Sequence, residues 1–257
     1  LDIEQFYISN EKGEPLDIIL GAIIAAGKRG VKVRIIIDSK MYKTYPEDAE
    51  WLEKQCENIV KHVIDFEHLA GGIQHSKYFI VDKNDVFLGS QNFDWRSLKH
   101  IHELGVRFSD HETARIYSDI FEEDWNYCDI DDGKSWSLPI FTINKPHFIL
   151  NSGLFGNSIH VLATISPVEL YHVNGDNDLN EIVFMIKNAS NEINLQFLSY
   201  NPNTKEGYWE EIDTALISAS KRGVKVRLLV SDWNLGKTAV EHFKTLISYA
   251  NFEVKYT

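Results

Sequence analysis

His75 and Lys77 stand two residues apart, and the polar segment from Ser90 to Asn92 follows them after a short apolar stretch. An imidazole can attack a phosphorus atom or transfer a proton, whereas an ammonium group and a carboxamide can hold phosphate oxygens. Together these residue types indicate a site for an anion that carries a reactive centre. A histidine and a lysine at this spacing are also typical of a solvated strand edge. The choice between the two interpretations depends on the elements that position these residues.

The residues between these groups predict a β-hairpin. Residues 78–81 are apolar and β-prone, residues 83–85 predict a turn, and residues 86–89 predict the returning strand. His75 and Lys77 are expected at the start of the first strand, and on one face of it, because side chains alternate along a strand. The end of the hairpin would then bring the second polar segment back to this pair.

The chain also contains an internal repeat. Seven residues that begin at Lys28 recur without change from Lys221, and Gln5-Phe6 is matched by Gln196-Phe197 at an offset two residues smaller. Each copy predicts a strand, a helix and a second strand, which is the pattern of a parallel α/β sheet. A chance match between two such units is the alternative, and seven identical residues in a row argue against it.

Apolar periodicity and glycine stops predict the same order of elements in both copies. In the first copy the expected elements are a strand at 3–9, a helix at 16–29, a strand at 31–38, a helix at 47–57 and a strand at 59–65. In the second copy they are a helix at 179–191, a strand at 193–200, a helix at 209–222, a strand at 224–231, a helix at 237–250 and a strand from 252. The sequence therefore predicts two homologous α/β halves.

These elements divide the chain into three parts. Residues 1–138 are expected to form the first half, residues 139–177 a linker region with many turn-forming residues, and residues 178–257 the second half, still incomplete at its end. The first half also contains an acidic stretch, residues 110–132, whose apolar side chains recur at helical spacing. This stretch predicts an amphipathic helix with a solvated outer face.

The composition excludes several functional classes. With 44% hydrophobic and 25% charged residues, the chain is typical of a globular protein, and no apolar run is long enough to span a membrane. The formal net charge of −12 excludes a basic coat for nucleic acid, although it leaves room for a local basic pocket. Two cysteines are too few for a disulfide scaffold. His75, His100 and His102 form a weak ligand set, so neither a metal nor another cofactor is expected.

The order of the polar residues resembles the signature of the phospholipase D superfamily, often called the HKD motif. His75-x-Lys77 is followed after four residues by Asp82, and later by the segment from Gly89 to Asn92. The resemblance implies a duplicated phospholipase D-like α/β fold of two similar halves, each with a mixed, mainly parallel sheet flanked by helices. Each half would give one motif to a single shared site, which agrees with the internal repeat.

The same resemblance implies a metal-free reaction in two steps. One histidine becomes a phosphohistidine, another protonates the leaving group, and water or an alcohol then resolves the intermediate. His75, Lys77 and Asn92 match the catalytic positions of the motif. Lys77 and Asn92 would also hold the phosphate, with Ser90 as a further contact. One copy of the motif does not indicate which histidine is the nucleophile.

Three more residues acquire expected roles from the resemblance. Asp82 and Gly89 match structural positions of the motif, where they support the fold and do not touch substrate. Glu103 fits the carboxylate that orients a histidine in the superfamily, and such a partner fixes the tautomer and stabilises the imidazolium. A surface carboxylate is the alternative interpretation of Glu103.

A closer resemblance comes from residues 89–98 and 103–105, together with residues 222–233 of the second half. These segments look like the branch that contains the lysosomal phospholipase D-like exonucleases and the poxviral nicking-joining enzyme. That branch favours single-stranded nucleic acid as the substrate, with 5′ exonuclease action. Phospholipid hydrolysis or transphosphatidylation, and a non-catalytic binding scaffold, are the alternatives.

The resemblance also implies a second motif. By the spacing of the repeat, its hairpin is expected roughly 10 to 30 residues after Thr257. If no such motif follows, the alternatives are a binding module or a site completed in a homodimer. The aromatic residues that could stack bases, should they line the cleft, are Tyr42, Tyr45, Trp95 and Trp233.

Overall fold

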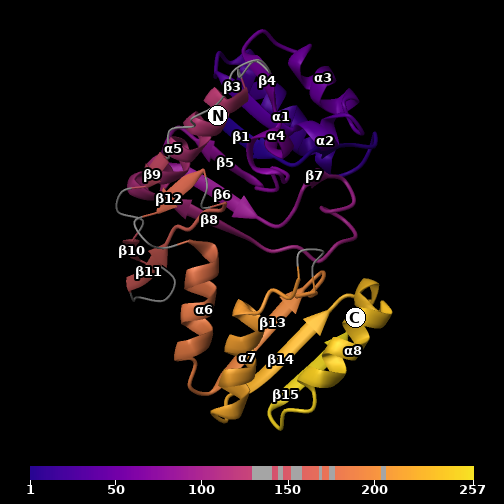
Figure 1. The fold of residues 1–257 in the computed structure, drawn as a ribbon. Helices are drawn as coiled ribbons and strands as arrows, with labels where there is room; N and C mark the ends of the chain where they lie inside the picture. The colour runs from indigo at the N-terminus through magenta and orange to yellow at the C-terminus, as the bar shows by residue number, and fades with distance from the viewer. Residues whose placement is uncertain (129–140, 144–146, 152–157, 168–169, 174–176, 204–206) are drawn as a thin grey trace. The chain divides into compact units, whose positions relative to one another are not determined.

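The computed structural model describes residues 1–128, 141–143, 147–151, 158–167, 170–173, 177–203 and 207–257 of the 257-residue chain. The chain divides into two compact units, Leu1–Gly175 and Asp176–Thr257, and Figure 1 shows helices and a sheet in each. Each unit contains the predicted repeat, a pair of parallel strands joined through a helix, so the duplicated α/β fold is confirmed. No helix among the described residues is long and apolar enough to cross a membrane.

The first unit is built on a six-stranded sheet with the order β4-β3-β1-β5-β6-β8. The strands are β1 (Asp2–Gln5), β3 (Val33–Asp38), β4 (Ile59–Ile64), β5 (Tyr78–Val81), β6 (Asp85–Gly89) and β8 (Gly105–Ser109). Strands β4, β3 and β1 are parallel, whereas the pairings from β1 through β5 and β6 to β8 are antiparallel. The sheet is therefore mixed, and its parallel part is the segment that the repeat predicted.

Helices cover both faces of this sheet. On one face, α1 (Leu16–Lys28) and α3 (Glu47–Glu53) pack against Ile3, Ile35 and Ile37. On the other face, α5 (His111–Cys128) packs through Phe121 against Ile36 and other strand residues. Because both faces are covered, the consecutive side chains from Ile35 to Asp38 are all buried, which explains the apolar run Ile35–Ile37.

Helix α5 is less solvated than the sequence predicted, and this is a correction. Asp124 is buried rather than exposed, in contact with Glu4 of β1. Glu122 accepts two hydrogen bonds from Arg34 of β3, at 2.9 and 2.8 Å. The Arg34 guanidinium also lies over the ring of Phe121. Two of the acids that were expected on the outer face of the helix therefore pair with groups of the sheet and anchor the helix there.

Strands β5 and β6 form the predicted hairpin. Val81 pairs with Asp85 next to the turn, and the backbone N–H of Asn84 bonds to the oxygen of Val81 at 3.0 Å. Asp82 and Lys83 have φ values of 53° and 52°. Two successive residues with positive φ give the turn whose twist matches that of the flanking strands.

The position of the His75 and Lys77 pair differs from the prediction. These residues lie in the segment between α4 (Phe66–Ala70) and β5, and not on the strand itself. The backbone N–H of Gln74 donates to the side chain of Asp38 at 2.8 Å. Gln74 is therefore bonded to a side chain at the end of β3. The segment that carries His75 and Lys77 lies outside the sheet until β5 begins.

Two short elements complete this end of the sheet. Helix α2 (Ser39–Tyr42) begins directly after β3, where the Asp38 side chain accepts hydrogen bonds from its first backbone N–H groups. Strand β2 (Ile8–Ser9) pairs in parallel with β7 (Phe93–Asp94). This pairing holds the segment after the hairpin against the segment after β1.

The region expected to link the halves contains strands of its own. They are β9 (Phe141–Ile143), β10 (His147–Asn151), β11 (Ser158–Leu162) and β12 (Tyr171–Val173). Strands β10 and β11 pair antiparallel, and β9 and β12 pair in parallel. These strands belong to the first compact unit. The turn-forming residues 152–153 and 156–157 lie outside the described residues.

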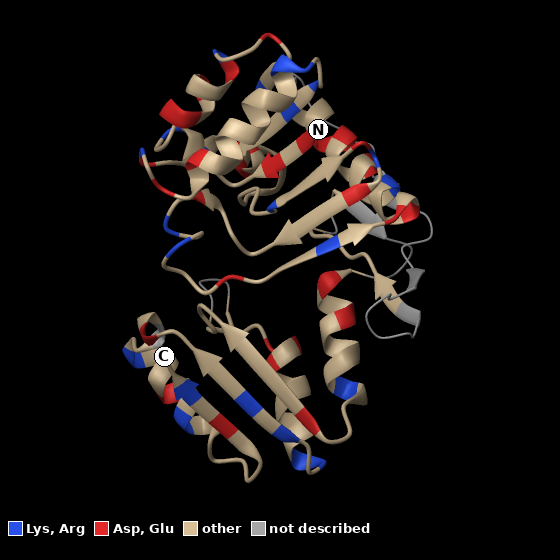
Figure 2. Ribbon diagram, turned by 180° about the vertical axis from the view of Figure 1, so that it is seen from behind, with Lys and Arg blue, Asp and Glu red and all other residues tan. Residues whose placement is uncertain are grey.

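The second unit has a three-stranded parallel sheet of β13 (Glu192–Phe197), β14 (Lys225–Val230) and β15 (Phe252–Tyr256). Helices α6 (Asp178–Asn188), α7 (Glu211–Lys221) and α8 (Lys237–Leu246) cover one face, and η1 (Asp232–Asn234) follows β14. The other face carries the ion pairs Lys225–Glu253 and Arg227–Glu192. Figure 2 shows the sheet of this unit from that face, with both positively and negatively charged residues on its strands. Both strand pairings of this sheet are parallel. Counted over the main sheets of both halves, most strand pairings are therefore parallel.

The strand register corrects one detail of the repeat. Ile3 pairs with Ile35 in the first unit, and Leu195 pairs with Leu228 in the second. Because Ile35 and Leu228 are equivalent in the repeat, Ile3 is equivalent to Leu195, and not to Asn194 as the matched Gln-Phe dipeptides implied. A shift of one residue turns a strand residue to the opposite face of the sheet, so the apolar pattern and not the dipeptide identity gives the correct alignment.

Candidate active site

The chain that leaves the carboxyl end of β1 carries two aromatic rings, Phe6 and Tyr7, which contact the motif residues. The His75 ring packs edge-on against Phe6, with 4.6 Å between the ring centroids. Lys77 Nζ lies 5.2 Å from the centroid of the same Phe6 ring. Asn92 donates from Nδ2 to the hydroxyl oxygen of Tyr7 at 3.4 Å. The structure therefore brings together, around one dipeptide, three residues that were predicted from both ends of the hairpin.

His75 is exposed to solvent at one edge of its ring, yet its pKa is lowered from the ordinary value. Partial burial of the ring is the largest cause, and the nearby charge of Lys77 adds to it, whereas the carboxylate of Asp38 opposes the shift. A lower pKa favours the neutral imidazole at pH 7, which has a lone pair available for attack or for accepting a proton.

Lys77 is almost completely buried, with 5% of its surface exposed. Its Nζ donates a hydrogen bond to the backbone oxygen of His75 at 2.6 Å. Burial lowers the pKa of the ammonium group to about 8, and Glu103 opposes this shift. Since an ammonium group has more donors than this one hydrogen bond uses, Lys77 can also bind an anion beside His75.

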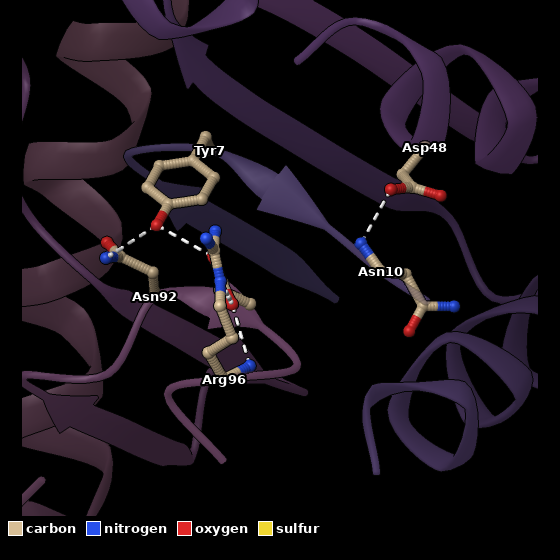
Figure 3. A network of polar contacts seen from close by, with 6 residues as sticks. Tyr7, Asn10, Asp48, Asn92 and Arg96 are labelled. Carbon is tan, nitrogen blue, oxygen red and sulfur yellow. Dashed lines mark hydrogen bonds and ion pairs between the residues drawn. The ribbon is translucent and has the colours of Figure 1, made fainter. Parts of the chain in front are cut away.

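Asn92 is joined to a second network, drawn in Figure 3. The Tyr7 hydroxyl that accepts from Asn92 donates in turn to Asp94 Oδ2 at 2.9 Å. Asp94 is buried and forms an ion pair with Arg96 at 2.5 Å. Burial and the Asp94 carboxylate raise the pKa of Tyr7 to about 12, so its hydroxyl stays protonated and fixes the direction of both hydrogen bonds. The Tyr7 ring stacks on Tyr45 with 5.1 Å between centroids.

Ser90 and Glu103 are close to each other at the junction of β6 and β8. The Ser90 hydroxyl donates to Glu103 Oε2 at 2.5 Å, and it accepts from the backbone N–H of Leu104 at 3.0 Å. Glu103 acts electrostatically on Lys77. Among the described residues, no hydrogen bond joins Glu103 to His75, and the histidine-orienting role of Glu103 stays a prediction.

The two structural positions of the motif lie at opposite ends of β6. Gly89 donates its backbone N–H to the oxygen of Lys77 at 3.1 Å, and a Cβ atom there would collide with the carboxamide of Gln91. Asp82 lies in the hairpin turn, and within the described part of the chain its carboxylate makes no hydrogen bond. Gly89 therefore bonds directly to the backbone of Lys77, whereas Asp82 lies in the hairpin turn with a positive φ.

Comparisons with known proteins agree with this geometry. Residues 1–125 match the family described as "Cardiolipin synthase, PLD-like domain". The whole chain is 31% identical to the "Virion nicking-joining enzyme" of Vaccinia virus (strain Western Reserve), over 99% of this chain and 63% of that protein. Almost over its whole length, the chain is thus similar to proteins of the phospholipase D superfamily. The HKD residues His75 and Lys77 thus lie in the matched region.

Other relatives in the superfamily have different names. The chain is 29% identical to "5'-3' exonuclease PLD3" of Rattus norvegicus, over 97% of this chain and 51% of that protein. It is 27% identical to "Phospholipase D Z" of Dictyostelium discoideum, over 100% of this chain and 65% of that protein. The chain therefore spans less than two thirds of the length of each of these three relatives.

A cavity of about 430 Å³ opens beside the HKD motif. Its lining includes His75, Gln74 and the buried carboxyl groups of Glu4 and Asp124. Glu4 accepts hydrogen bonds from Gln74 Nε2 at 2.5 Å and from the Tyr78 hydroxyl at 2.7 Å, and it also bonds to Asp124. Burial raises the pKa of Glu4, whereas its hydrogen bonds with Tyr78, Gln74 and Asp124 oppose the shift.

Sequence reasoning missed Phe6, Tyr7, Asp38 and Arg96 as members of this superfamily site. One signal for Phe6, Tyr7 and Asp38 was available, because all three follow the carboxyl ends of parallel strands, where sites gather in α/β sheets. Arg96 carried no such signal, since its role depends on a tertiary contact with Tyr7 through Asp94.

The other candidate residues lie in different surroundings. Trp95 packs edge-on with His100, Tyr42 donates a hydrogen bond to Glu50, and Trp233 is exposed in the second unit. Of the three aromatic residues of the first unit that were proposed for base stacking, Tyr45 contacts the HKD site, through Tyr7. No three His, Cys, Asp or Glu side chains of the described residues are grouped so that they could hold a metal ion.

Proposed function

We propose that the protein is a phosphodiesterase that acts through a phosphohistidine and needs no metal ion. The observation that carries the proposal is the meeting of His75, Lys77 and Asn92 around Phe6 and Tyr7. This arrangement puts a neutral imidazole next to a buried cation and a carboxamide, which together suit a phosphate anion with its phosphorus atom beside the imidazole.

The reaction has two steps. In the first, a histidine nitrogen attacks phosphorus while the bond from phosphorus to the leaving oxygen breaks, and a second histidine gives its proton to that oxygen. In the second, a water oxygen attacks the phosphohistidine, the phosphorus–nitrogen bond breaks, and the proton of the water returns to the second histidine. His75 takes one of these roles, and a second copy of the motif supplies the other histidine. Lys77 and Asn92 bind the phosphate oxygens, with Ser90 at the edge.

Single-stranded nucleic acid is the substrate that we propose. Relatives named nicking-joining enzyme and 5'-3' exonuclease support it. The stack of Tyr7 on Tyr45 beside Asn92 supports it as well, because aromatic side chains next to a phosphate site are typical of proteins that bind unpaired bases. Phospholipid hydrolysis is the second candidate function, and the relative named "Phospholipase D Z" is the observation that favours it.

The experiment compares His75→Ala with wild type in the full-length protein, on a single-stranded oligonucleotide, on phospholipid vesicles and on a p-nitrophenyl phosphodiester. The variant should lose oligonucleotide cleavage by about 10²-fold or more. If His75 is the nucleophile, the p-nitrophenyl ester is lost too. If it is the proton donor, the first release of p-nitrophenolate survives, because p-nitrophenolate leaves without protonation, and only the second step, in which this histidine takes the proton of the water, becomes slow.

Ser76→Ala is the matched control, since Ser76 is an exposed neighbour with no place in the proposed reaction. Thermal unfolding should be unchanged in both variants, because truncation of the exposed His75 ring leaves no cavity in the core. Normal turnover of all three substrates by a folded His75→Ala variant would contradict the proposal. Vesicle hydrolysis with no oligonucleotide cleavage would favour the phospholipid candidate.

A further inference from the structure

Arg96 has an exposed, positively charged side chain that is held in place by Asp94. Its side chain is 45% exposed, whereas that of its partner Asp94 is 2% exposed. Arg96 Nε and Nη2 donate to the two oxygens of Asp94 at 3.0 and 2.5 Å, and the backbone N–H of Arg96 donates to Asp94 Oδ1 at 2.7 Å. The planar guanidinium is therefore held at two points, so little rotamer freedom is left to lose when a ligand binds it.

The Arg96 guanidinium has more N–H donors than its protein partners use. Asp94 takes two of its N–H groups and Tyr45 is a third partner. An arginine side chain has more N–H donors than these contacts use, and half of this one faces solvent. Arginine is also the side chain best suited to phosphate, because its planar fork can donate two parallel hydrogen bonds to phosphate oxygens.

The location of Arg96 is fixed relative to the phosphate site. Asn92 Nδ2, the Tyr7 hydroxyl, Asp94 Oδ2 and Arg96 Nη2 follow one another in hydrogen bonds of 3.4, 2.9 and 2.5 Å (Figure 3). Phe6 and Tyr7 are neighbours with 5.6 Å between ring centroids. His75 and Lys77 contact Phe6, whereas Arg96 belongs to the Tyr7 network. The cation is thus joined to the phosphate site through the hydrogen bonds of Tyr7 and Asp94.

We propose that Arg96 binds a second phosphate of the substrate, the one adjacent to the reacting phosphate held by Lys77 and Asn92. Between the two phosphates of a polynucleotide lies one nucleoside, and the Tyr7–Tyr45 stack lies between Arg96 and the Phe6 side of the site, where that base can pack. The site then selects strands with consecutive phosphodiesters over molecules with a single one. This inference rests on the proposed function and adds to it the feature that distinguishes the substrates.

The test uses two substrates that differ by one phosphodiester, a dinucleoside monophosphate and the corresponding trinucleoside diphosphate, with the full-length protein. Wild type should have a lower KM for the longer substrate. Arg96→Gln should raise that KM by about tenfold to a hundredfold, the usual effect of losing a hydrogen bond to a charged group, and should raise the KM of the shorter substrate far less. The slope of log KM against log salt concentration for the longer substrate should fall by about 0.7.

Lys99→Gln is the matched control. Lys99 is 44% exposed and paired with Glu14, so the change removes the same charge three residues away and should alter neither KM nor the salt slope. Arg96→Gln leaves the buried Asp94 carboxylate without its ion pair, which can cost folding stability. Arg96→Lys is therefore measured beside it, because it keeps the charge and loses the fork, and it should show the same loss confined to the longer substrate.

Each outcome separates the inference from the proposed function. Equal losses on both substrates, in whichever Arg96 variant folds, would mean that Arg96 only supports Asn92 and would overturn the inference. Wild type that cleaves both substrates with the same KM and salt slope would overturn it too, while the proposed function stands. Wild type that cleaves neither nucleotide would overturn the proposed nucleic-acid substrate itself.

Discussion

Lys77 Nζ donates a hydrogen bond to the backbone oxygen of His75 at 2.6 Å, so the cation is bound to the same residue whose ring is proposed to react. This contact fixes the distance between the two groups whatever the substrate. It also explains part of the lowered pKa of His75, because a positive charge this close disfavours the imidazolium. The two neighbouring side chains both titrate, and the ionisation of each affects the pH dependence of the reaction.

The first prediction concerns the alkaline side of the pH profile. Burial lowers the pKa of Lys77 to about 8, so the ammonium group loses its proton, and its hold on phosphate, as the pH rises through that value. We expect kcat/KM to fall above about pH 8, since this parameter reports the ionisations of the free enzyme. Lys77→Arg keeps a positive charge at all these pH values, so its residual activity should lack this alkaline limb. The measurement is kcat/KM against pH for both proteins, and an identical limb in the two would rule out Lys77 as its cause.

The second prediction concerns the buried pair Glu4 and Asp124. The pKa of Glu4 is raised by burial, so the folded protein holds a proton that the unfolded chain releases. Stability from this group is present below the unfolded pKa of 4.5 and is lost as the pH rises through the higher folded value. Gln74, Tyr78 and Asp124 are the polar groups that face Glu4 from the adjoining elements.

We therefore expect the urea midpoint of wild type to decrease, as the pH rises from 4.5 through the higher folded pKa of Glu4, more than that of Glu4→Gln, which keeps a neutral hydrogen-bonding group. Glu67→Gln, an exposed carboxyl of α4, is the control and should follow wild type. Parallel curves for wild type and Glu4→Gln would show that Glu4 titrates no differently in the folded protein.

The fold could be predicted where local pattern and tertiary structure agree. The apolar run of β3 after Gly30 identified a buried parallel strand, because only a strand covered on both faces has such a run. Its copy β14 after Gly223 was identified by the repeat instead, since buried and exposed side chains alternate along it. The hairpin was predictable for a similar reason, since its turn residues break two short β-prone stretches. The register of β1 was not, because two adjacent residues can match by identity while the apolar alternation requires a shift of one.

The site was predictable in its residues and less so in its contacts. His75, Lys77 and Asn92 follow from the motif, but the rings of Phe6 and Tyr7 that bring them together belong to another strand. The contact between Glu4 and Asp124 of α5 was not predictable either. An acidic helix predicts a solvated face on average, and the sequence does not identify which of its acids meets a buried partner.

The third prediction is that a chelator leaves activity intact. In the proposed reaction the nucleophile is an imidazole, the negative charge is balanced by Lys77, and the leaving oxygen is protonated by a histidine, so no step needs a Lewis acid. Turnover of the oligonucleotide should be the same after dialysis against EDTA as before it. Activity that is lost in EDTA and restored by a divalent cation would contradict the mechanism, and zinc or magnesium added back separately would identify the ion.

The last prediction separates two roles for Glu103. Its carboxylate accepts a hydrogen bond from Ser90 and raises the pKa of Lys77 against the effect of burial. Without that negative charge the pKa of Lys77 should fall further, so Glu103→Gln should move the alkaline limb of kcat/KM to lower pH. The acidic limb, which reports His75, should stay where it is, because no hydrogen bond joins Glu103 to His75 among the described residues.

A histidine-orienting carboxylate would give the opposite result. It stabilises the imidazolium, so its loss would move the acidic limb and leave the alkaline one in place. Ser90→Ala is the matched control, since it removes the partner of Glu103 and keeps the charge that acts on Lys77. If Glu103→Gln shifts only the acidic limb in the full-length protein, then Glu103 reaches His75 during the reaction, and the separation of the two groups described above would not hold in the working enzyme.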